Sequence, residues 1–403
     1  MDIYVARQPI FNRKQKIYGY ELLFRDGVAN AFPDIDGDSA TSKLLSHSFF
    51  SMGLDHITGG KIAFVNFTDQ LLEKKIPLLF PKDKLTVEIL EDVEPAEAVL
   101  EGCRELRSKG YQLALDDFTY RPHLKPLIDL ARIIKVDFIL TPREGLPGVL
   151  EKLRPFPVKL LAEKVETHEE FDYALDMGFE YFQGYFFSKP KVLKGKGPSP
   201  AKITLLQIMA EANKENCRFS ELEKVIQRDV AISYNLMRYI NSAYFRRVQE
   251  ITSLRQAIVL LGEKEIRRFV SLTALANLAE DKPDELIRAS IIRAKLCELL
   301  ADAGGSRVDG AELFTLGLFS LIDAILDDHI QNIMEELPLS NEIKSALIKG
   351  EGRLAGYLKI ARCYESGDWQ GFQEAVAHTG VRDEKLPGFY MNAVSWAENF
   401  TSL

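Results

Sequence analysis

Polar side chains recur in the first half of the chain at regular intervals. From Asn66 onward, the intervals between successive members are 22, 28, 19, 28 and 20 residues, about one strand and one helix each. Each member is costly inside a strand, because a charged or amide group loses its hydration on burial. Their spacing predicts one shared site, formed by Glu21, Asn66, Glu88, Asp116 with Asp117, Lys135, Glu163 and Gln183.

The residue types in this set indicate the chemistry. Its five carboxylates would repel one another unless cations or Lys135 compensate their charge. Oxygen ligands without histidine or cysteine favour Mg²⁺, Mn²⁺ or Ca²⁺ over zinc. A metal pair held by carboxylates suits the hydrolysis of a phosphate ester, which is therefore the predicted chemistry.

Short apolar runs contain these polar residues and are typical of buried strands. Helix-like stretches, such as residues 95–109 and 168–177, lie between the runs, and this alternation predicts parallel strand–helix–strand units. In a parallel barrel the C-terminal ends of the strands share one rim, so the polar residues would converge there. The seven predicted strands are residues 17–24, 62–67, 85–90, 111–118, 132–139, 158–165 and 181–188.

The pattern changes after a segment rich in Gly, Pro, Ser and Lys at residues 191–200, which is typical of a linker. Beyond it, apolar residues recur at helical spacing, and residues 285–303 and 311–333 are long and apolar on one face. Gly262 is expected to end a helix. We predict an α/β domain at 1–190, a linker at 191–200 and an all-α domain at 201–403.

Composition limits the partners and the location. The 403 residues include 51 Lys and Arg and 59 Asp and Glu, and the net charge of −8 gives no bulk attraction to nucleic acid or anionic lipid. Four separated cysteines without a C-x-x-C pair are typical of reduced thiols. The N-terminus shows no signal-peptide pattern, and no apolar run approaches the roughly 18 residues of a membrane span. We expect a cytoplasmic protein without a membrane or nucleic-acid partner.

Motifs around the polar residues resemble those of EAL-domain cyclic di-GMP phosphodiesterases. The run Glu21-Leu22-Leu23-Phe24-Arg25 is similar to the E-A-L-x-R signature of that family. The resemblance covers about residues 1–190. The later motifs follow in the same order as Asn66, Glu88-Ile89-Leu90-Glu91, Asp116-Asp117-Phe118, Lys135-Val136-Asp137, Glu163-Lys164-Val165-Glu166 and Gln183-Gly184-Tyr185-Phe186.

This resemblance implies a modified TIM barrel with one antiparallel strand. It further implies two Mg²⁺ or Mn²⁺ ions, cleavage of cyclic di-GMP to pGpG, and a homodimer. Lys135 and Glu163 would be catalytic and act on the water, while Arg25 and Gln183 would bind the substrate or support the site. Glu91 would hold the loop after the fourth strand. The implied metal ligands are Glu21, Asn66, Glu88, Asp116 and Asp117.

Two departures from the family pattern leave catalysis open. The loop at residues 116–122 lacks both glycines of the family's Asp-Asp-Phe-Gly-Thr-Gly run, so a conformation with positive φ is penalised. Lys164 replaces a glycine beside Glu163 and could add a cation near the rim. The alternatives are an active phosphodiesterase and a degenerate barrel that binds cyclic di-GMP without cleavage, or acts as a protein scaffold.

The second half resembles the HDOD domain, a relative of the HD phosphohydrolases. Residues 228–230, 241–243, 251–257 and 260–262 follow its pattern. Where an HD enzyme has His-Asp, this chain has Ser320-Leu321, which cannot supply that metal-binding pair. We expect a regulatory or protein-binding role without catalysis, through a protein partner that the sequence does not name.

Overall fold

The structure is a computed structural model that describes residues 4–25, 53–190, 230–241, 253–303, 308–337 and 339–401, with single residues between 202 and 251. Contacts divide the chain into one unit of Met1–Phe187 with Glu365–Gly367, and another of Ser188–Tyr364 with Asp368–Leu403. The linker expected at 191–200 lies outside the described residues. The domain limits 1–190 and 201–403 stay predictions.

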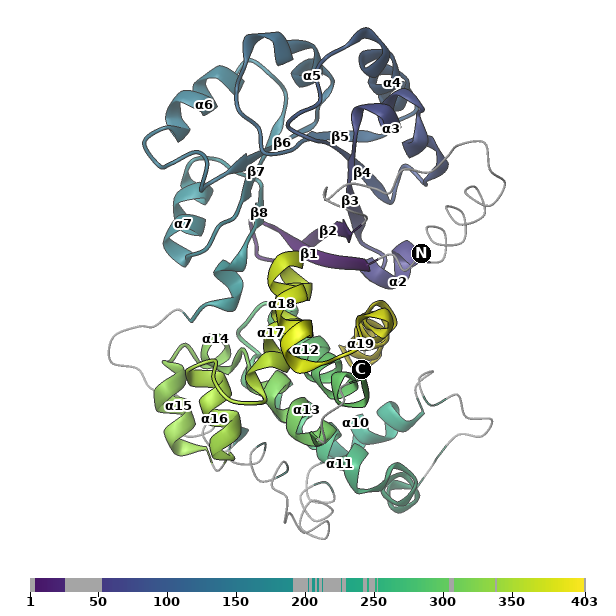
Figure 1. Cartoon of the computed structure of the whole chain (residues 1–403), viewed down its shortest axis with the longest axis vertical. Coiled ribbons are helices and arrows are strands. Elements are labelled where there is room, and N and C mark those ends of the chain that lie inside the picture. Colours follow the sequence, from purple (N-terminus) through teal and green to yellow (C-terminus); the bar gives the residue numbers. More distant parts are fainter. Residues whose placement is uncertain are drawn as a thin grey trace. The chain divides into compact units, whose positions relative to one another are not determined.

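The first unit contains a closed barrel whose eight strands follow one another in sequence order (Figure 1). Successive strands from β2 to β8 pair in parallel, whereas β1 is antiparallel to both β2 and β8. The α/β barrel with one antiparallel strand is confirmed. The strands are β1 Tyr4–Asn12, β2 Ile17–Arg25, β3 Ile62–Phe67, β4 Leu85–Ile89, β5 Gln112–Leu115, β6 Ile133–Asp137, β7 Lys159–Glu163 and β8 Tyr181–Gln183.

The prediction of seven strands was wrong, because it left out β1. This strand contains Arg7, Gln8 and Pro9 in its middle, so it lacks the continuous apolar run that marks the other strands. A tight turn joins it to β2, in which the Asn12 side chain accepts hydrogen bonds from the backbone N–H groups of Lys14 and Lys16 at 2.9 and 3.1 Å. The last predicted strand was also too long, because Tyr185–Ser188 forms a 3₁₀ turn.

Helices lie on the outside of the strands of this unit (Figure 1). The expected helices at 95–109 and 168–177 correspond to α4 and α7. Helix α7 begins with a capping box, in which Thr167 and Glu170 exchange side-chain-to-backbone hydrogen bonds. The helices are α2 Gly53–Thr58, α3 Asp69–Glu73, α4 Glu97–Ser108, α5 Lys125–Leu130, α6 Leu146–Leu153 and α7 His168–Asp176, with 3₁₀ turns at Ile76–Leu79 and Pro122–Leu124.

Apolar side chains form a buried layer inside the barrel. The layer consists of Ile10, Phe64, Ala114, Ile133, Leu161 and Tyr181. Five of these residues, all but Ile10, precede a residue of the predicted site by two positions, as Phe64 precedes Asn66 and Ile133 precedes Lys135. Side chains two positions apart on a strand point to the same face, so the polar residues form the next layer toward the C-terminal rim.

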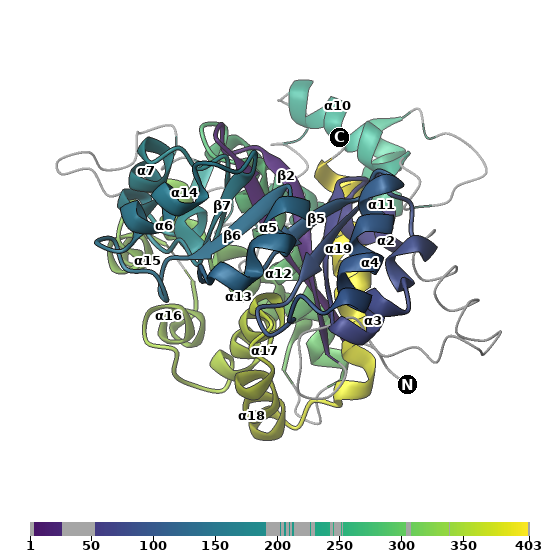
Figure 2. The same cartoon turned by 90° about the horizontal axis from the view of Figure 1, so that it is seen from above.

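The second unit is helical wherever the structure describes it. Helix α12 packs along α13 and α19 (Figure 2). The stretch 285–303 matches α12, but residues 311–333 form three helices instead of one. Gly262 has a non-helical backbone with a φ of 72°, so a helical segment of α11 ends there, as expected. The helices are α10 Val230–Ile240, α11 Leu254–Leu278, α12 Asp284–Ala303, α13 Gly310–Phe319, α14 Ile322–Leu326, α15 Ile330–Glu336, α16 Asn341–Ile348, α17 Ala355–Ser366, α18 Trp369–Thr379 and α19 Leu386–Thr401.

Candidate active site

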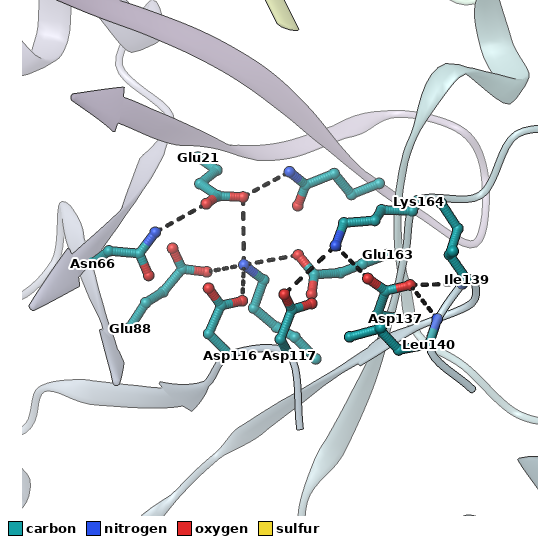
Figure 3. A network of polar contacts seen from close by, with 12 residues as sticks. Glu21, Asn66, Glu88, Asp116, Asp117, Asp137, Ile139, Leu140, Glu163 and Lys164 are labelled. Carbon is teal, nitrogen blue, oxygen red and sulfur yellow. Dashed lines mark hydrogen bonds and ion pairs between the residues drawn. The ribbon is translucent and has the colours of Figure 1, made fainter. Parts of the chain in front are cut away.

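Four carboxylates surround one buried lysine in the polar layer of the barrel (Figure 3). The Nζ atom of Lys135, on β6, lies 2.7 Å from Oε1 of Glu88 and 2.7 Å from Oδ1 of Asp116. It lies 2.8 Å from Oε1 of Glu163 and 3.3 Å from Oε2 of Glu21. The lysine side chain is fully buried, so this positive charge is shielded from water and acts on all four carboxylates.

Side-chain amides fix the orientation of Glu21. Asn66 Nδ2 donates to Glu21 Oε1 at 3.1 Å, and Gln183 Nε2 donates to Glu21 Oε2 at 2.7 Å. Asn66 also stands directly across the sheet from Glu88, in register on β3 and β4. The predicted ligands Glu21, Asn66 and Glu88 therefore lie together, with Gln183 behind Glu21.

Gln8, which the sequence pattern did not predict as a site residue, belongs to the same layer. Its Oε1 accepts a hydrogen bond from Gln183 Nε2 at 2.9 Å, and it stands opposite Glu21 in the β1–β2 pairing. Gln8 lies two positions before Ile10 of the apolar layer, whereas on the parallel strands the polar residue follows its apolar partner. Recognition of β1 as an antiparallel strand would have identified Gln8 from this spacing.

A second group of charges lies beside the first (Figure 3). Carboxylate oxygens of Asp116, Asp117 and Glu163 lie within 4.8 Å of one another, close enough to share a cation. The ammonium group of Lys164 lies 3.5 Å from Asp117 Oδ2 and also contacts Asp137 Oδ2. The expectation that Lys164 places a cation near the rim agrees with this geometry.

Burial and mutual repulsion change the acidity of these groups. Burial raises the pKa of Glu88 and Glu163, and neighbouring carboxylates add to the effect while Lys135 opposes it. Burial and the charge of Asp116 raise the pKa of Asp117 to about 6. Burial would lower the pKa of Lys135, but the four carboxylates outweigh it and raise the pKa. Burial in this site therefore opposes ionisation of Glu88, Glu163 and Asp117, and added positive charge would favour it.

The donor set fits divalent cations. Buried oxygens without a hydrogen-bond partner include Asn66 Oδ1, Glu88 Oε2 and Glu163 Oε2, and such orphaned acceptors are costly unless a cation or water completes them. Counted as ionised, the six carboxylates around Lys135 and Lys164 exceed these two ammonium groups by four negative charges. Two divalent ions carry that charge, and an all-oxygen shell suits Mg²⁺, Mn²⁺ or Ca²⁺.

Of the remaining predicted site residues, one has no described side chain and one lies outside this cluster. The side chain of Arg25 lies outside the described residues, although its backbone ends β2. Glu91 is exposed and lines a pocket that also includes Asp117, Phe118 and Thr119, beside the loop it was expected to hold.

The loop after β5 adopts its conformation without the glycines of the family pattern. Among residues 116–122 a positive φ occurs at Asp117 alone, at 38°, and Pro122 begins a 3₁₀ turn. The backbone N–H of Phe118 donates to Lys135 O at 3.0 Å and so ties the loop to β6. The strain that the sequence predicted for the loop is therefore confined to Asp117, one of the predicted metal ligands.

In the helical unit, the position of the HD pair is occupied by a structural hydrogen-bond network. Ser320 Oγ accepts from Arg293 Nη1 at 3.0 Å and donates to Gly317 O at 2.7 Å, while Leu321 is buried. No helix among the described residues is both long and apolar enough to cross a membrane.

Comparison with known proteins gives two family assignments. Residues 56–190 match the EAL domain and residues 198–348 match the HDOD domain, which confirms both assignments made from the sequence. A Vibrio cholerae protein named cyclic di-GMP phosphodiesterase CdgJ is 37% identical over 406 residues, covering 99% of this chain and 93% of that relative.

Two further proteins extend the comparison. The uncharacterized protein YuxH of Bacillus subtilis is 37% identical over 409 residues, covering 99% of both chains. The crystal structure of a standalone EAL protein from Vibrio cholerae with bound c-di-GMP is 27% identical, with a TM-score of 0.35 and coverage of 47% of this chain and 92% of that one.

Proposed function

We propose that this chain, which belongs to the family of proteins that join an EAL domain to an HDOD domain, hydrolyses cyclic di-GMP to linear pGpG in its barrel. The observation that carries the proposal is the convergence of Glu21, Glu88, Asp116 and Glu163 with unpartnered buried oxygens. Such a site attracts divalent cations and, through them, a phosphodiester. Of the two relatives described above that align along nearly the whole chain, the Vibrio cholerae protein bears the name of this activity.

Five side chains would hold two Mg²⁺ or Mn²⁺ ions. Glu21 on β2, Glu88 on β4 and Asp116, which directly follows β5, present carboxylates, and the unpartnered Oδ1 of Asn66 adds a neutral oxygen. Asp117 lies at the edge of the cluster with Asp116 and Glu163. When bound, the ions supply Lewis-acid stabilisation of negative charge on the phosphate oxygens.

Glu163 and Lys135 would act on the attacking water. Glu163 Oε1 is held by Lys135, while its Oε2 has no hydrogen-bond partner and is free to accept a proton from water. Burial raises the pKa of Glu163, which makes its carboxylate a stronger base. In this hydrolysis the water oxygen would bond to phosphorus while the P–O3′ bond breaks. Glu163 would take the proton that the water releases, and the leaving 3′ oxygen would be protonated to give the hydroxyl of pGpG.

Three further residues complete the proposal. Arg25, at the end of β2, would pair with a phosphate oxygen of the substrate through its guanidinium group. Gln183 supports the site by orienting Glu21, and its Oε1 is left without a partner to bind substrate or water. Glu91 would hold the loop that carries Asp117.

The test is incubation of the full chain with cyclic di-GMP and either Mg²⁺ or Mn²⁺, with chromatographic detection of pGpG. The Glu163→Gln variant keeps the size of the side chain and removes the base, so it should lose about a hundredfold or more in rate. Binding of cyclic di-GMP by this variant, measured by calorimetry in Ca²⁺, should persist. Absence of pGpG with both metals between pH 6 and 9 would refute hydrolysis.

A second function is a cyclic di-GMP receptor without catalysis. The contact between Lys164 and Asp117 favours it, because a predicted metal ligand is already paired with an ammonium group. Calorimetric binding without pGpG formation would support the receptor, and absence of binding would leave a protein scaffold. In each case we propose that the helical unit is regulatory and binds a protein partner. The homodimer stays a prediction.

A further inference from the structure

Lys164 has an unusual backbone conformation next to Glu163. Its φ of 54° lies in the left-handed region, which residues with a Cβ atom adopt at an energetic cost. Asp117, on the facing loop, is also left-handed, with a φ of 38°. Both residues contribute charged side chains to one contact at the edge of the polar layer, so the local strain accompanies a specific ion pair.

Asp137 anchors the ammonium group of Lys164. Its Oδ1 accepts hydrogen bonds from the backbone N–H groups of Ile139 and Leu140 at 2.6 and 3.0 Å, and its Oδ2 contacts Lys164. Asp137 is 2% exposed and stands in register with Glu163 on the neighbouring strand. The anchor is therefore rigid and holds the Lys164 ammonium beside the predicted metal ligands.

Asp117 is shared between this ammonium group and a cation position. Its carboxylate lies within 4.8 Å of oxygens of Asp116 and Glu163, while Lys164 Nζ lies 3.5 Å from its Oδ2. The Oε2 atom of Glu163, which is 6% exposed, has no hydrogen-bond partner at this position. A divalent ion bound to Asp117 at this position would experience repulsion from Lys164.

The two lysines of the site differ in their freedom to leave it. Lys135 is fully buried among four carboxylates, whereas the side chain of Lys164 is 48% exposed. Lys164 can therefore turn toward solvent when a divalent ion approaches Asp117, while Lys135 cannot. The ammonium group of Lys164 can therefore be displaced from Asp117 by a divalent ion while the backbone of Lys164 stays in place.

We propose that Lys164 competes with the second divalent ion for Asp117, so that the site binds one ion tightly and a second ion weakly. The inference rests on the metal site of the proposed function. The first ion would use Glu21, Asn66, Glu88 and Asp116, which Lys164 does not contact. The second ion requires Asp117 and hence the displacement of Lys164, which makes Lys164 a positioning residue that tunes metal occupancy.

The experiment is calorimetric titration of Mn²⁺ alone into the full chain after removal of metals with a chelator. The wild-type protein should show a tight and a weak step, and Lys164→Met should tighten the weak step by about tenfold or more, because the repelling charge is gone. Lys164→Arg keeps the charge and should stay near wild type. Lys152→Met is the matched control, since this exposed lysine of α6 lies 5.2 Å from the Tyr120 ring and contacts the same loop.

A further variant separates the charge of Lys164 from its strained backbone. Lys164→Gly removes both the charge and the strain, whereas Lys164→Met removes the charge alone. An effect seen with Gly and not with Met would overturn the proposal in favour of backbone relaxation. Equal isotherms for wild type and Lys164→Met would also overturn it.

The outcomes distinguish this inference from the proposed function. Equal isotherms together with pGpG formation would leave the function standing and remove the role of Lys164. A tightened second step without pGpG formation would support the role of Lys164 and remove hydrolysis. Absence of Mn²⁺ binding in every variant would refute the metal site itself, and both proposals with it.

Discussion

Replacement of Lys135 by methionine tests the electrostatic account of the barrel. The variant removes the ammonium group that four carboxylates share, at similar side-chain volume. Loss of one partner from a buried ion pair costs about 3–5 kcal/mol. Since 1 kcal/mol shifts the melting temperature of a domain of this size by about 2–4 °C, the barrel transition should fall by roughly 6–20 °C.

The loss should depend on pH in a defined direction. Burial raises the pKa of Glu88 and Glu163 above the ordinary value of 4.5, so the folded barrel binds more protons than the unfolded chain above that pH. Its stability therefore falls as the pH rises through this window. Lys135 opposes these shifts, so its removal should raise the pKa of both carboxyls in the folded barrel further. The difference in stability between variant and wild type should therefore be larger at pH 8 than at pH 5.

The positions of the two tryptophans allow the unfolding of the two units to be measured separately. Both tryptophans, Trp369 and Trp396, lie in α18 and α19 of the helical unit, so their fluorescence follows that unit while calorimetry follows both. The calorimetric transition that is not accompanied by a change in tryptophan fluorescence is therefore the unfolding of the barrel. Lys159→Met is the matched control, because this half-exposed lysine of β7 pairs with Glu180 at 3.0 Å and its loss should cost less than about 1 kcal/mol.

Metal provides the second arm of the test. Melting is measured in a chelator and then with Mn²⁺, which at a hundred times its dissociation constant adds about 2.7 kcal/mol for each bound ion. Mn²⁺ should therefore recover most of the stability that Lys135→Met loses. A barrel transition within 2 °C of wild type in chelator at pH 8, by the scale of about 2–4 °C per kcal/mol, would refute the central role of Lys135.

Two further substitutions test local features. Gly184→Ala should destabilise the barrel by about 2 kcal/mol or more, because the φ of Gly184 is 145° and a Cβ atom would lie 2.1 Å from Val165 O. The control is Gly148→Ala in α6, where a Cβ atom meets nothing within 4 Å. Equal melting temperatures of the two variants would contradict the prediction. Burial lowers the pKa of Lys295 from 10.5 to about 8, so the unfolded chain binds more protons between these values and the stability of the helical unit should rise with pH there, by at most about 3 kcal/mol. Lys295→Met should abolish this rise in denaturant titrations followed by tryptophan fluorescence, and a variant that keeps the rise would contradict the assignment.

The barrel and most of its polar layer were predictable, because each parallel strand is a short apolar run with one polar residue near its C-terminal end. Strand β1 was not, since Arg7, Gln8 and Pro9 interrupt its apolar pattern. Gln8 lies on this strand and was therefore not predicted as a site residue. The pattern of a buried strand identifies strands with two apolar faces and fails for a strand with mixed faces.

Contacts that depend on unusual backbone conformations could also not be predicted from the sequence. The approach of Lys164 to Asp117 and Asp137 requires left-handed φ values at Lys164 and Asp117, which residues other than glycine rarely adopt. The single helix expected at 311–333 divides near Ser320 and at Asp327, which has a φ of 56°. The apolar spacing continues across both breaks, so periodicity alone does not reveal them.

The two layers inside the barrel have an evolutionary consequence. The apolar layer and the strand register close the barrel, while the polar layer adds buried carboxylates whose raised pKa values mark a loss of stability. Joint replacement of the four carboxylates and Lys135 by apolar residues would keep the apolar layer and would relieve that loss, whereas replacement of one partner alone would not. Loss of the whole polar layer is therefore thermodynamically favoured, and selection for the proposed function would have to oppose that loss.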